Sequence, residues 1–378
     1  MRIAQVANFV APHSGGIRTV LHHLATGYHR SGHEVVQVVP GVARRRVPEA
    51  WGYREELAGR PIPRTGYRVL HPAPVRRLLA ALTPDRIEVH DRLTLRGLGR
   101  WAAGRGVPAL VVSHERLDRW AAQWLPAPVL RTRAAGALID RSNAALAGSF
   151  ATVVCTTGWA AAEFGRLPGV SVRIVPLGVD PAGFGPDRFD PRLRPPGGEP
   201  LLVMASRLSR EKRPDLALRT VETLAGRGIP ARLVVLGDGP MRADLAALAA
   251  ERGLPVRFLG HRPPPEVAGW LATADVAIAP GPVETFCLAA VEALASGTPV
   301  VGNAASAIAD VIGPAGLIAD GTPDAFADAV EKLLHRSEFG RRAAARARAA
   351  HFGWAATVRD MLQIHEAAGA GDHPIGTC

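Results

Sequence analysis

The chain has 378 residues, 47% of them hydrophobic and 21% charged, which is typical of a soluble globular protein with room for two domains. No apolar run reaches the length of a membrane span, and residues 3–10 are too few and lack a cleavage pattern for a signal peptide, so we expect a cytoplasmic protein. Cys155, Cys287 and Cys378 are widely spaced, which favours neither a disulfide framework nor a zinc site.

The net charge of +11 suggests a nucleic-acid or membrane partner, but the basic residues are nearly all arginine. Lys212 and Lys332 are the only two lysines. Such a preference is typical of codon bias, so the charge is a weak clue and we expect no nucleic-acid partner. Lys212 then marks either a place where a compact ammonium is needed or a lysine retained by chance.

The chain begins with a predicted strand over residues 2–7 and a predicted helix over residues 17–30. The loop between them contains Gly15 and Gly16, whose backbone can approach a phosphate because no Cβ intervenes. The loop lacks the G-x-G-x-x-G dinucleotide pattern, and a glycine pair before a helix is often only a turn. Strand, loop and helix in this order are typical of a nucleotide-binding α/β domain.

A second strand is predicted over residues 34–39, followed by an irregular region around residues 44–46. Residues 74–82 form a predicted amphipathic helix with Arg76 and Arg77 on one side. A basic amphipathic helix can lie on an anionic membrane surface. A solvated helix in the outer layer of the domain is the alternative.

Polar clusters follow the next two predicted strands, at residues 86–89 and 109–112. The clusters are residues 90–92 (His-Asp-Arg) and 113–116 (Ser-His-Glu-Arg). Open α/β sheets bind ligands at the carboxyl ends of their strands, so these residues are candidates by position. His114 could donate to a developing negative charge or hold a sugar hydroxyl, although a single histidine at a strand end is more often structural. Strands at residues 152–155 and 172–175 complete the first sheet.

A second alternating run of strands and helices begins at residue 201, after a segment rich in Pro, Gly, Asp and Arg. The fold class predicted is α/β, with two Rossmann-like domains facing a cleft. We expect an acceptor-binding domain over residues 1–180, a linker over 181–200, a nucleotide-sugar-binding domain over 201–352, a helix crossing back to the first domain over 353–368 and a tail over 369–378.

The loop after the first strand of this second domain contains Arg207 and Lys212. Two cations at the ligand edge can neutralise a diphosphate without a metal. No Asp-x-Asp carboxylate pair is visible in the sequence, so we expect no metal site. Two exposed cations in an arginine-rich chain are the alternative.

Glu284 lies in the loop between a predicted strand at residues 276–279 and a predicted helix at residues 286–295, and Glu292 lies two turns into that helix. At about 100° per helical residue, eight residues place the two carboxylates roughly 80° apart, so both can face one ligand. A helix N-terminus suits a phosphate, and the carboxylates can accept hydrogen bonds from sugar hydroxyls. The alternative is an acidic loop residue followed by an ordinary helical glutamate.

Gly15-Gly16, His114, Arg207 with Lys212, and the E-x7-E spacing of Glu284 and Glu292 occur here in the order found in one enzyme family. The chain resembles the family 4 retaining glycosyltransferases of the GT-B fold over nearly its whole length. Residues 91–96, 113–118, 154–157 and 279–286 are most similar to members that use GDP-mannose to extend phosphatidylinositol dimannoside by an α-1,6-linked mannose.

The resemblance implies a role for each matching residue. Gly16 would donate its N–H to the donor phosphate, and His114 would contact the sugar near the reacting carbon. The remaining donor-binding residues implied are Arg207 and Lys212 at the diphosphate, Glu284 at the sugar hydroxyls, Glu292 at the ribose, and Gly15, Thr285, Phe286, Cys287 and Leu288 around them. Cys287 stands where the family usually has glycine, so the phosphate loop must accommodate a Cβ here.

No carboxylate nucleophile is identifiable, so the hypothesis is a metal-independent front-face transfer with charge stabilisation on the leaving diphosphate. The expected partners are a nucleotide-sugar donor, a glycolipid acceptor and the inner face of the membrane, with no cofactor besides the donor. The alternatives are a transferase with another nucleotide sugar and a non-lipid acceptor, a GT-B sugar-nucleotide epimerase, and a nucleic-acid-binding protein.

Overall fold

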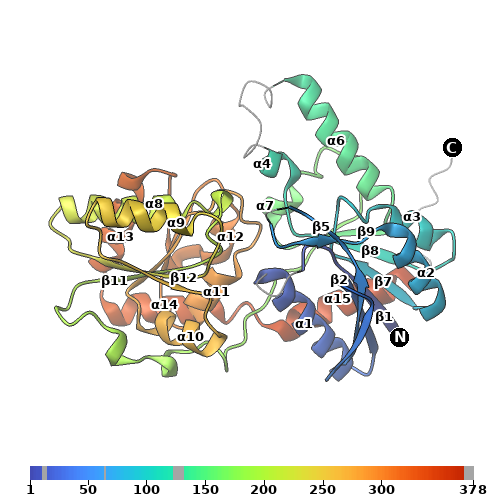
Figure 1. The fold of residues 1–378 in the computed structure, drawn as a ribbon, viewed down its shortest axis with the longest axis horizontal. Coiled ribbons are helices and arrows are strands. Elements are labelled where there is room, and N and C mark those ends of the chain that lie inside the picture. The colour runs from blue at the N-terminus through green and yellow to red at the C-terminus, as the bar shows by residue number, and fades with distance from the viewer. Residues whose placement is uncertain (11–14, 64, 122–131, 370–378) are drawn as a thin grey trace. The chain divides into compact units, whose positions relative to one another are not determined.

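The structure is a computed structural model that describes residues 1–10, 15–63, 65–121 and 132–369 (Figure 1). The chain divides into two compact units. Unit 1 is Met1–Pro176 together with the C-terminal segment from Trp354, and unit 2 is Leu177–Gly353.

Unit 1 is built on a sheet in the order β10-β9-β8-β7-β1-β2-β4-β3. Its paired strands run parallel except for β3, which runs antiparallel to β4. The central strands are largely apolar because helices cover both faces of a parallel sheet, although β1, β2 and β7 each carry one buried polar side chain, Gln5, Gln37 and Glu88. The sheet strands are β1 Arg2–Val6, β2 Glu34–Gly41, β3 Arg45–Glu49, β4 Gly52–Ala58, β7 Arg86–Val89, β8 Ala109–Ser113, β9 Thr152–Cys155 and β10 Val172–Ile174; β5 Arg60–Pro61 and β6 Arg68–Val69 form a separate pair.

The prediction of an irregular region around residues 44–46 is wrong, because β3 and β4 form an antiparallel pair there. Cross-strand ion pairs support this pair, from Arg45 to Glu56 at 3.1 Å and from Arg46 to Glu55 at 2.5 Å. A strand at the edge of a sheet is commonly rich in charge, so it lacks the apolar pattern by which sequence analysis finds strands.

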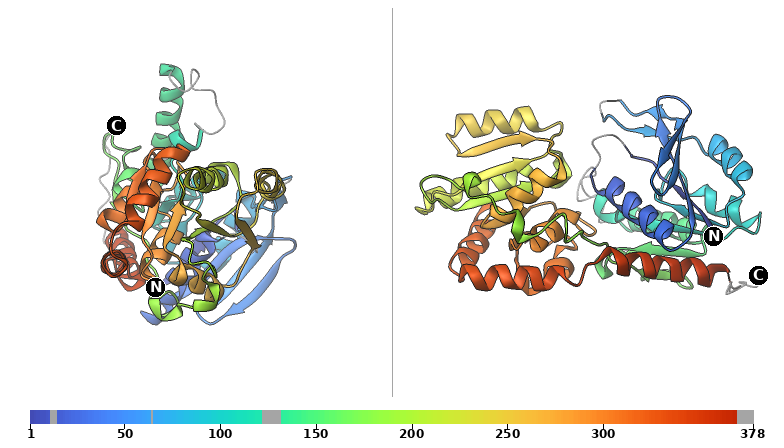
Figure 2. Two further views of the ribbon diagram at one scale, coloured as in Figure 1. Left: turned by 90° about the vertical axis from the view of Figure 1, so that its left-hand side faces the viewer. Right: turned by 90° about the horizontal axis from the view of Figure 1, so that it is seen from below.

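The helices of unit 1 include the C-terminal helix α15, which packs along α1 (Figure 2). The close approach depends on Gly27, because a Cβ at this position would lie 2.3 Å from a methyl carbon of Val358. The predicted return of the last helix to the first domain is thus confirmed. These helices are α1 Gly16–Arg30, α2 Pro72–Leu82, α3 Gly97–Ala103, α4 Leu117–Ala121, α6 Arg133–Ala147, α7 Gly158–Ala161 and α15 Trp354–Gly369.

Unit 2 contains a parallel sheet in the order β13-β12-β11-β14-β15-β16. Numbered from its first strand, this is the 3-2-1-4-5-6 order of a Rossmann fold, so the predicted α/β class with two Rossmann-like domains is confirmed. The strands are β11 Leu201–Ala205, β12 Arg232–Leu236, β13 Val256–Gly260, β14 Val276–Ala279, β15 Val300–Asn303 and β16 Leu317–Ala319. The helices are α8 Pro214–Gly226, α9 Arg242–Glu251, α10 Pro264–Thr273, α11 Leu288–Ala295, α12 Ile308–Ile312, α13 Pro323–Leu334 and α14 Glu338–Ala349.

The segment at residues 181–200, predicted to be a linker, lies within unit 2. It forms two 3-10 turns, Pro186–Arg188 and Pro191–Leu193, that contact α10. The Asp190 N–H donates to the Thr273 hydroxyl at 3.0 Å, and Arg194 pairs with Asp275 at 2.6 Å. The structure therefore differs from the predicted boundary, because proline and aspartate here form fixed turns instead of an open connection.

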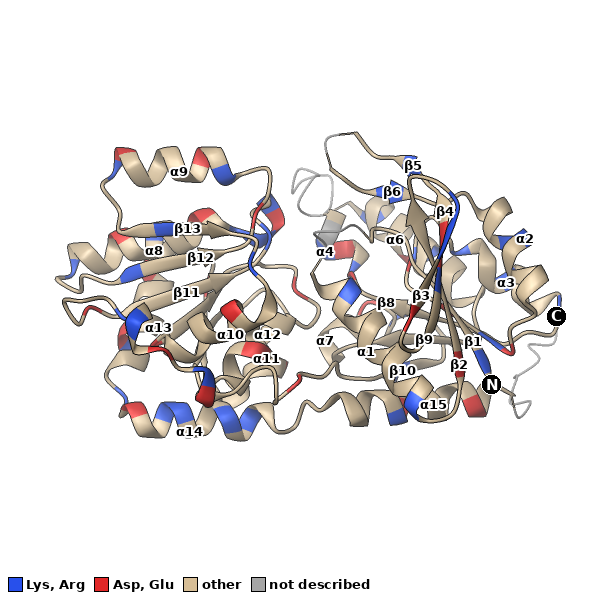
Figure 3. Cartoon of the chain, turned by 60° about the horizontal axis from the view of Figure 1, so that its bottom comes forward, with Lys and Arg blue, Asp and Glu red and all other residues tan. Residues whose placement is uncertain are grey.

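The basic residues are distributed over many elements, including α2 and α15 in unit 1 and α14 in unit 2 (Figure 3). Acidic residues lie among them, for example in the Arg342–Glu338 pair on α14 at 2.8 Å. This distribution agrees with a compositional origin for the net charge. Within the described residues, no helix is both long and apolar enough to cross a membrane.

Candidate active site

The candidate site in unit 2 lies where the strand order changes direction, between β11 and β14. In open α/β sheets, ligands bind outside the carboxyl ends of the two strands at such a point. The loop after β11 contains Arg207 and Lys212, and the loop after β14 contains Glu284. The topology thus brings together residues that lie about seventy positions apart in the sequence.

Lys212 and Glu284 form an ion pair across these two loops, with 2.6 Å between Nζ and Oε1. The side chains are 29% and 14% exposed, so both remain accessible at the rim of the unit. Burial lowers the pKa of Lys212, but its neighbours, chiefly the Glu284 carboxylate together with Cys287 and Glu211, outweigh this effect, and the pKa lies above its usual value. Lys212 is therefore a permanent cation at neutral pH.

Helix α11 begins at Leu288, two residues later than predicted. Glu284 lies in the loop before the helix, as predicted, and the angle of about 80° does not apply because it assumes a continuous helix between the two carboxylates. Cys287 precedes the helix with φ 73° and ψ 78°, a left-handed conformation that glycine adopts without strain. Within the part of the chain that the structure describes, no side chain caps the N-terminus of α11, and its first turn carries no acidic residue.

The thiol of Cys287 and the carboxyl of Glu292 lie in the same environment as the ion pair. Burial raises the pKa of Cys287 well above its usual value, and the Glu284 carboxylate adds to the rise, so the thiol stays protonated. Burial likewise raises the pKa of Glu292 to about 7. Phe286 is buried at the base of the loop, edge-on to Phe352 with 5.6 Å between ring centroids. Thr285 and Leu288 are half-buried.

The loop that contains Arg207 is fixed by the glycine-rich turn after β12. The Leu208 N–H donates to the Asp238 carbonyl, and the Met241 N–H donates to the Leu208 carbonyl, both at 3.0 Å. A Cβ at Gly237 would lie 2.0 Å from the Ser206 carbonyl oxygen, and one at Gly239 would lie 2.4 Å from that of Leu208. Glycine is therefore required where the two backbones meet.

In unit 1 the strand order changes direction between β1 and β7. Gly15 precedes the first turn of α1 and Gly16 begins it; among the described residues no side chain caps this helix, and its first turn contains no acidic residue. The rest of the preceding loop, residues 11–14, lies outside the described residues. The helix end suits an anion electrostatically, as predicted for the Gly15-Gly16 pair.

His114 lies at the end of β8 in a chain of hydrogen bonds that leads into the core. Its Nε2 is 2.8 Å from Nδ1 of His90, and Nε2 of His90 is 2.6 Å from Oε1 of Glu88. The two imidazole rings stack at 17°. Burial, followed by the effect of His90, lowers the pKa of His114 to about 3, so this histidine is neutral at pH 7.

The other members of the two predicted clusters shape the loops. Asp91 accepts from Asn8 Nδ2 at 2.9 Å, which joins the ends of β1 and β7. Arg92 is buried, pairs with Glu163, and donates to the Glu115 carbonyl at 2.6 Å. These contacts hold the segment after β8, which contains His114, in a defined position.

Arg76 and Arg77 of α2 differ in their surroundings. Arg76 is half-buried, and its Nη2 donates to the Gly97 carbonyl at 3.3 Å, whereas Arg77 is exposed. Of the two predicted membrane contacts, Arg77 is therefore the one available at the surface.

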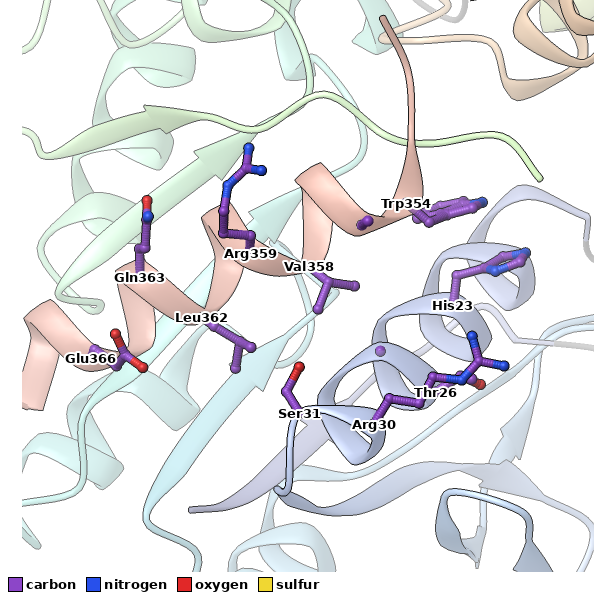
Figure 4. Close-up of a pocket in the computed structure, with 12 residues that line it drawn as sticks. His23, Thr26, Arg30, Ser31, Trp354, Val358, Arg359, Leu362, Gln363 and Glu366 are labelled. Atoms are coloured by element: carbon purple, nitrogen blue, oxygen red, sulfur yellow. The ribbon is translucent and has the colours of Figure 1, made fainter. Parts of the chain in front are cut away.

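A groove of about 560 Å³ lies elsewhere in unit 1, between α1 and α15 (Figure 4). At one end the indole of Trp354 stacks on the His23 ring at 4.5 Å and 9°. Arg30 and Glu366 are among its lining residues, but none of the predicted site residues is. The groove follows from how the two helices pack and is separate from the predicted chemistry.

Sequence analysis missed Glu88, Tyr28 and His365, which complete the hydrogen-bond network behind His114. A glutamate within the apolar strand β7 was a signal, because a buried carboxylate requires hydrogen-bond donors. Nothing in the sequence indicated that the donors come from α1 and α15.

The chain matches two families over adjacent segments. Residues 15–179 match the family described as glycosyl transferase 4-like domain, and residues 187–350 match glycosyl transferases group 1.

Similar proteins cover nearly the whole chain. It is 46% identical to the GDP-mannose-dependent alpha-(1-6)-phosphatidylinositol dimannoside mannosyltransferase of Mycobacterium tuberculosis, with 96% of this chain and 95% of that protein covered. It is 33% identical to a D-inositol 3-phosphate glycosyltransferase of Xylanimonas cellulosilytica, covering 88% and 83%. A sucrose-phosphate synthase from Thermosynechococcus elongatus has a similar fold, with a TM-score of 0.82 at 20% identity and with 98% and 100% of the chains covered. The chain is therefore a glycosyltransferase of the GT-B fold. It belongs to the glycosyl transferases group 1 family and has a glycosyl transferase 4-like domain in its first half.

Proposed function

We propose that this glycosyltransferase transfers mannose from GDP-mannose, in α-1,6 linkage, to a glycolipid of the phosphatidylinositol mannoside type. The observation that carries the proposal is the 46% identity to a mannosyltransferase of that specificity, which extends over 96% of the chain. A likeness of that extent includes both the donor-binding and the acceptor-binding halves, so it supports both substrates.

The donor would be held mainly by unit 2. Lys212 and Arg207 supply positive charge for the diphosphate, and the uncapped N-terminus of α11 supplies N–H donors. Glu284 would accept from the sugar hydroxyls and Glu292 from the ribose. The Lys212–Glu284 ion pair supports this division, because the two side chains lie 2.6 Å apart and could contact adjacent parts of one donor.

Unit 1 would supply Gly16 for the phosphate, His114 for the sugar and the binding site for the acceptor. The reaction would follow the front-face route with retention. The departing phosphate oxygen would accept the proton of the acceptor hydroxyl, while Lys212 and Arg207 stabilise the developing negative charge without a metal. Trapping of a covalent mannosyl adduct on any aspartate or glutamate would contradict this route.

A lipid acceptor requires the enzyme to work at a membrane surface. Arg77 is exposed on α2, and one arginine near an anionic bilayer contributes about 1 kcal/mol to binding. We propose a peripheral contact through this residue.

A donor panel tests the function. GDP-mannose, UDP-glucose and UDP-GlcNAc are each incubated with the enzyme and a lipid extract, and products are read by mass spectrometry. The proposal predicts a hexose added to a phosphatidylinositol mannoside from GDP-mannose alone. Preference for a UDP-sugar would show that GDP-mannose is not the donor, and a non-lipid product would show that the acceptor is not a glycolipid. Interconversion of the nucleotide sugar without any acceptor would indicate an epimerase.

A further inference from the structure

We propose that Asn303, the last residue of β15, is a positioning residue for donor binding. It holds the loop of residues 280–287 between β14 and α11 (the β14 loop), so that Glu284 meets Lys212 in the free enzyme. The inference deepens the proposed function, because it rests on the β14 loop binding the donor. It adds the segment after β15, residues 303–307, to the parts of unit 2 that build the site.

The β14 loop begins beside the carboxyl end of β15. The two strands pair in parallel with Ala279 opposite Gly302, so the residues that follow them leave the sheet at the same edge. Asn303 is buried, its Nδ2 donates to the Pro280 carbonyl at 2.8 Å, and its Oδ1 accepts from the Ala305 N–H at 3.0 Å. Because only Nδ2 can donate and only Oδ1 can accept, these two contacts fix which end of the amide faces the loop.

Residues 303–307 form a turn that has its own hydrogen bonds. The N–H and the hydroxyl of Ser306 both donate to the Asn303 carbonyl, at 3.2 Å and 2.8 Å. The turn is followed by Ala307, whose N–H donates to the Glu284 carbonyl at 2.9 Å. The β14 loop is therefore held at two points, Pro280 and Glu284, by the segment that follows the neighbouring strand.

The position of the loop at Pro280 matters because the next residue has little room. A Cβ at Gly281 would lie 3.2 Å from Glu284 Oε1 and 3.4 Å from the Cα of Lys212. Pro280 is buried, and a buried carbonyl that loses its donor is costly until it finds another partner. Without the Asn303 amide, the start of the loop should shift, and the 2.6 Å contact between Glu284 and Lys212 should loosen with it.

The expected effect of Asn303 is on donor binding. A loop that is already fixed in the free enzyme loses less conformational entropy when the donor binds. A contact that is equally strong before and during the reaction changes KM and leaves kcat nearly unchanged. A residue needed only for folding would instead lower the amount of active enzyme, which reduces the apparent kcat at an unchanged KM.

Two variants of Asn303 test this role by steady-state kinetics and calorimetry. Asn303→Ala removes both side-chain contacts, whereas Asn303→Thr keeps a hydroxyl for the Ala305 N–H but is too short to reach the Pro280 carbonyl. In both variants we expect the KM for GDP-mannose to rise about tenfold and the affinity for GDP to fall about tenfold, with kcat changed by less than about threefold.

Thr298→Val is the matched control, because it removes a buried side-chain hydrogen bond just before the other end of β15. The Thr298 hydroxyl donates to the Leu271 carbonyl at 2.5 Å. The control should lose thermal stability, as the Asn303 variants do, and keep the wild-type KM and GDP affinity. A lower kcat at unchanged KM in Asn303→Thr, or an equal loss of GDP affinity in Thr298→Val, would overturn the proposal.

The mobility of the β14 loop tests the same inference without any activity. Relaxation of ¹⁵N in the whole unliganded enzyme gives the order parameter of the Glu284 amide, which is about 0.85 for a rigid backbone and below about 0.6 for a flexible one. We expect a rigid amide in the wild type and in Thr298→Val, and a flexible one in Asn303→Thr. A flexible amide in the wild type, or a rigid one in Asn303→Thr, would overturn the proposal.

These measurements separate the two proposals. If Asn303→Ala does not fold, Asn303→Thr decides, and the wild-type order parameter stands by itself. Absence of GDP binding and of mannosyl transfer in the wild type would contradict the proposed function, whereas the order parameters would still decide whether Asn303 holds the loop.

Discussion

The Lys212 ammonium lies 2.6 Å from Glu284 Oε1 and joins the two loops at the carboxyl ends of β11 and β14. Each charge holds the other at the point of the sheet where a ligand is expected. A donor that binds here meets a cation already oriented by a carboxylate, which reduces the entropy that the side chains lose on binding.

Lys212→Ala and Arg207→Ala should each lower mannosyl transfer at least 100-fold, because each removes a charge that we propose stabilises the leaving diphosphate. Steady-state kinetics and circular dichroism measure the rate and the fold. Lys332→Ala is the matched control, since Lys332 is the other lysine and is exposed on α13. Near-normal turnover in Lys212→Ala or Arg207→Ala would contradict the proposed role of that residue in binding the diphosphate.

Glu292→Gln should change the pH dependence of stability. The folded-state pKa of Glu292 is raised from 4.5 to about 7, so the unfolded chain ionises first as the pH rises. Wild-type stability should therefore fall between about pH 4.5 and 7, by at most about 3 kcal/mol, and the variant should lack this decline. Thermal unfolding at pH 5 and pH 8 measures this pH dependence. The variant should be more stable than the wild type only at pH 8. Parallel pH profiles would show that Glu292 is not buried as described.

Cys287→Gly should be more stable than Cys287→Ala by about 1 kcal/mol, because alanine retains the left-handed strain that glycine avoids. Both variants lose the thiol, so their comparison isolates the backbone. Chemical denaturation measures the difference. Equal stabilities would mean that the loop relaxes out of the conformation with φ 73°.

Gly239→Ala should displace the Arg207 loop, since its Cβ would lie 2.4 Å from the Leu208 carbonyl. We expect a loss of about 1–3 kcal/mol in stability and weaker GDP binding, measured by thermal unfolding and calorimetry. Gly226→Ala on α8 is the control, because nothing lies within 4 Å of its added Cβ. Unchanged GDP affinity in Gly239→Ala would show that the turn after β12 does not position the donor-binding loop.

Arg77→Ser should weaken binding to anionic liposomes about fivefold, the effect of about 1 kcal/mol. Arg219→Ser removes the same charge from an exposed position in unit 2 and should leave binding unchanged. Flotation with vesicles of phosphatidylcholine and phosphatidylinositol measures both. Equal binding of Arg77→Ser and wild type would remove α2 from the membrane contact.

Much of the fold was predictable because its parallel strands are largely apolar. Those at 86–89, 152–155 and 276–279 have the predicted bounds. The charged edge pair β3–β4 was missed, since its stability comes from ion pairs and not from an apolar face. The segment at residues 181–200 differed for a related reason, because composition alone does not show which turns are fixed by contacts such as Arg194–Asp275.

The candidate site was predictable where it depends on strand ends and motif spacing, as for Arg207, Lys212 and Glu284. The roles of the predicted donor-site residues stay predictions. The support behind His114 was not predictable, because Glu88 obtains donors from Tyr28 and His365, which lie far away in the sequence. Such contacts are set by packing, to which a single sequence gives no direct access.

The most direct measurement uses purified phosphatidylinositol dimannoside and GDP-mannose labelled with ¹³C at the anomeric carbon. Product analysis by NMR reports the acceptor, the linkage and the anomeric configuration in one reaction. We expect one added mannose in α configuration, attached through a 6-hydroxyl and absent from the product of Lys212→Ala. A β-linked product, or label that is never transferred to the lipid, would contradict it.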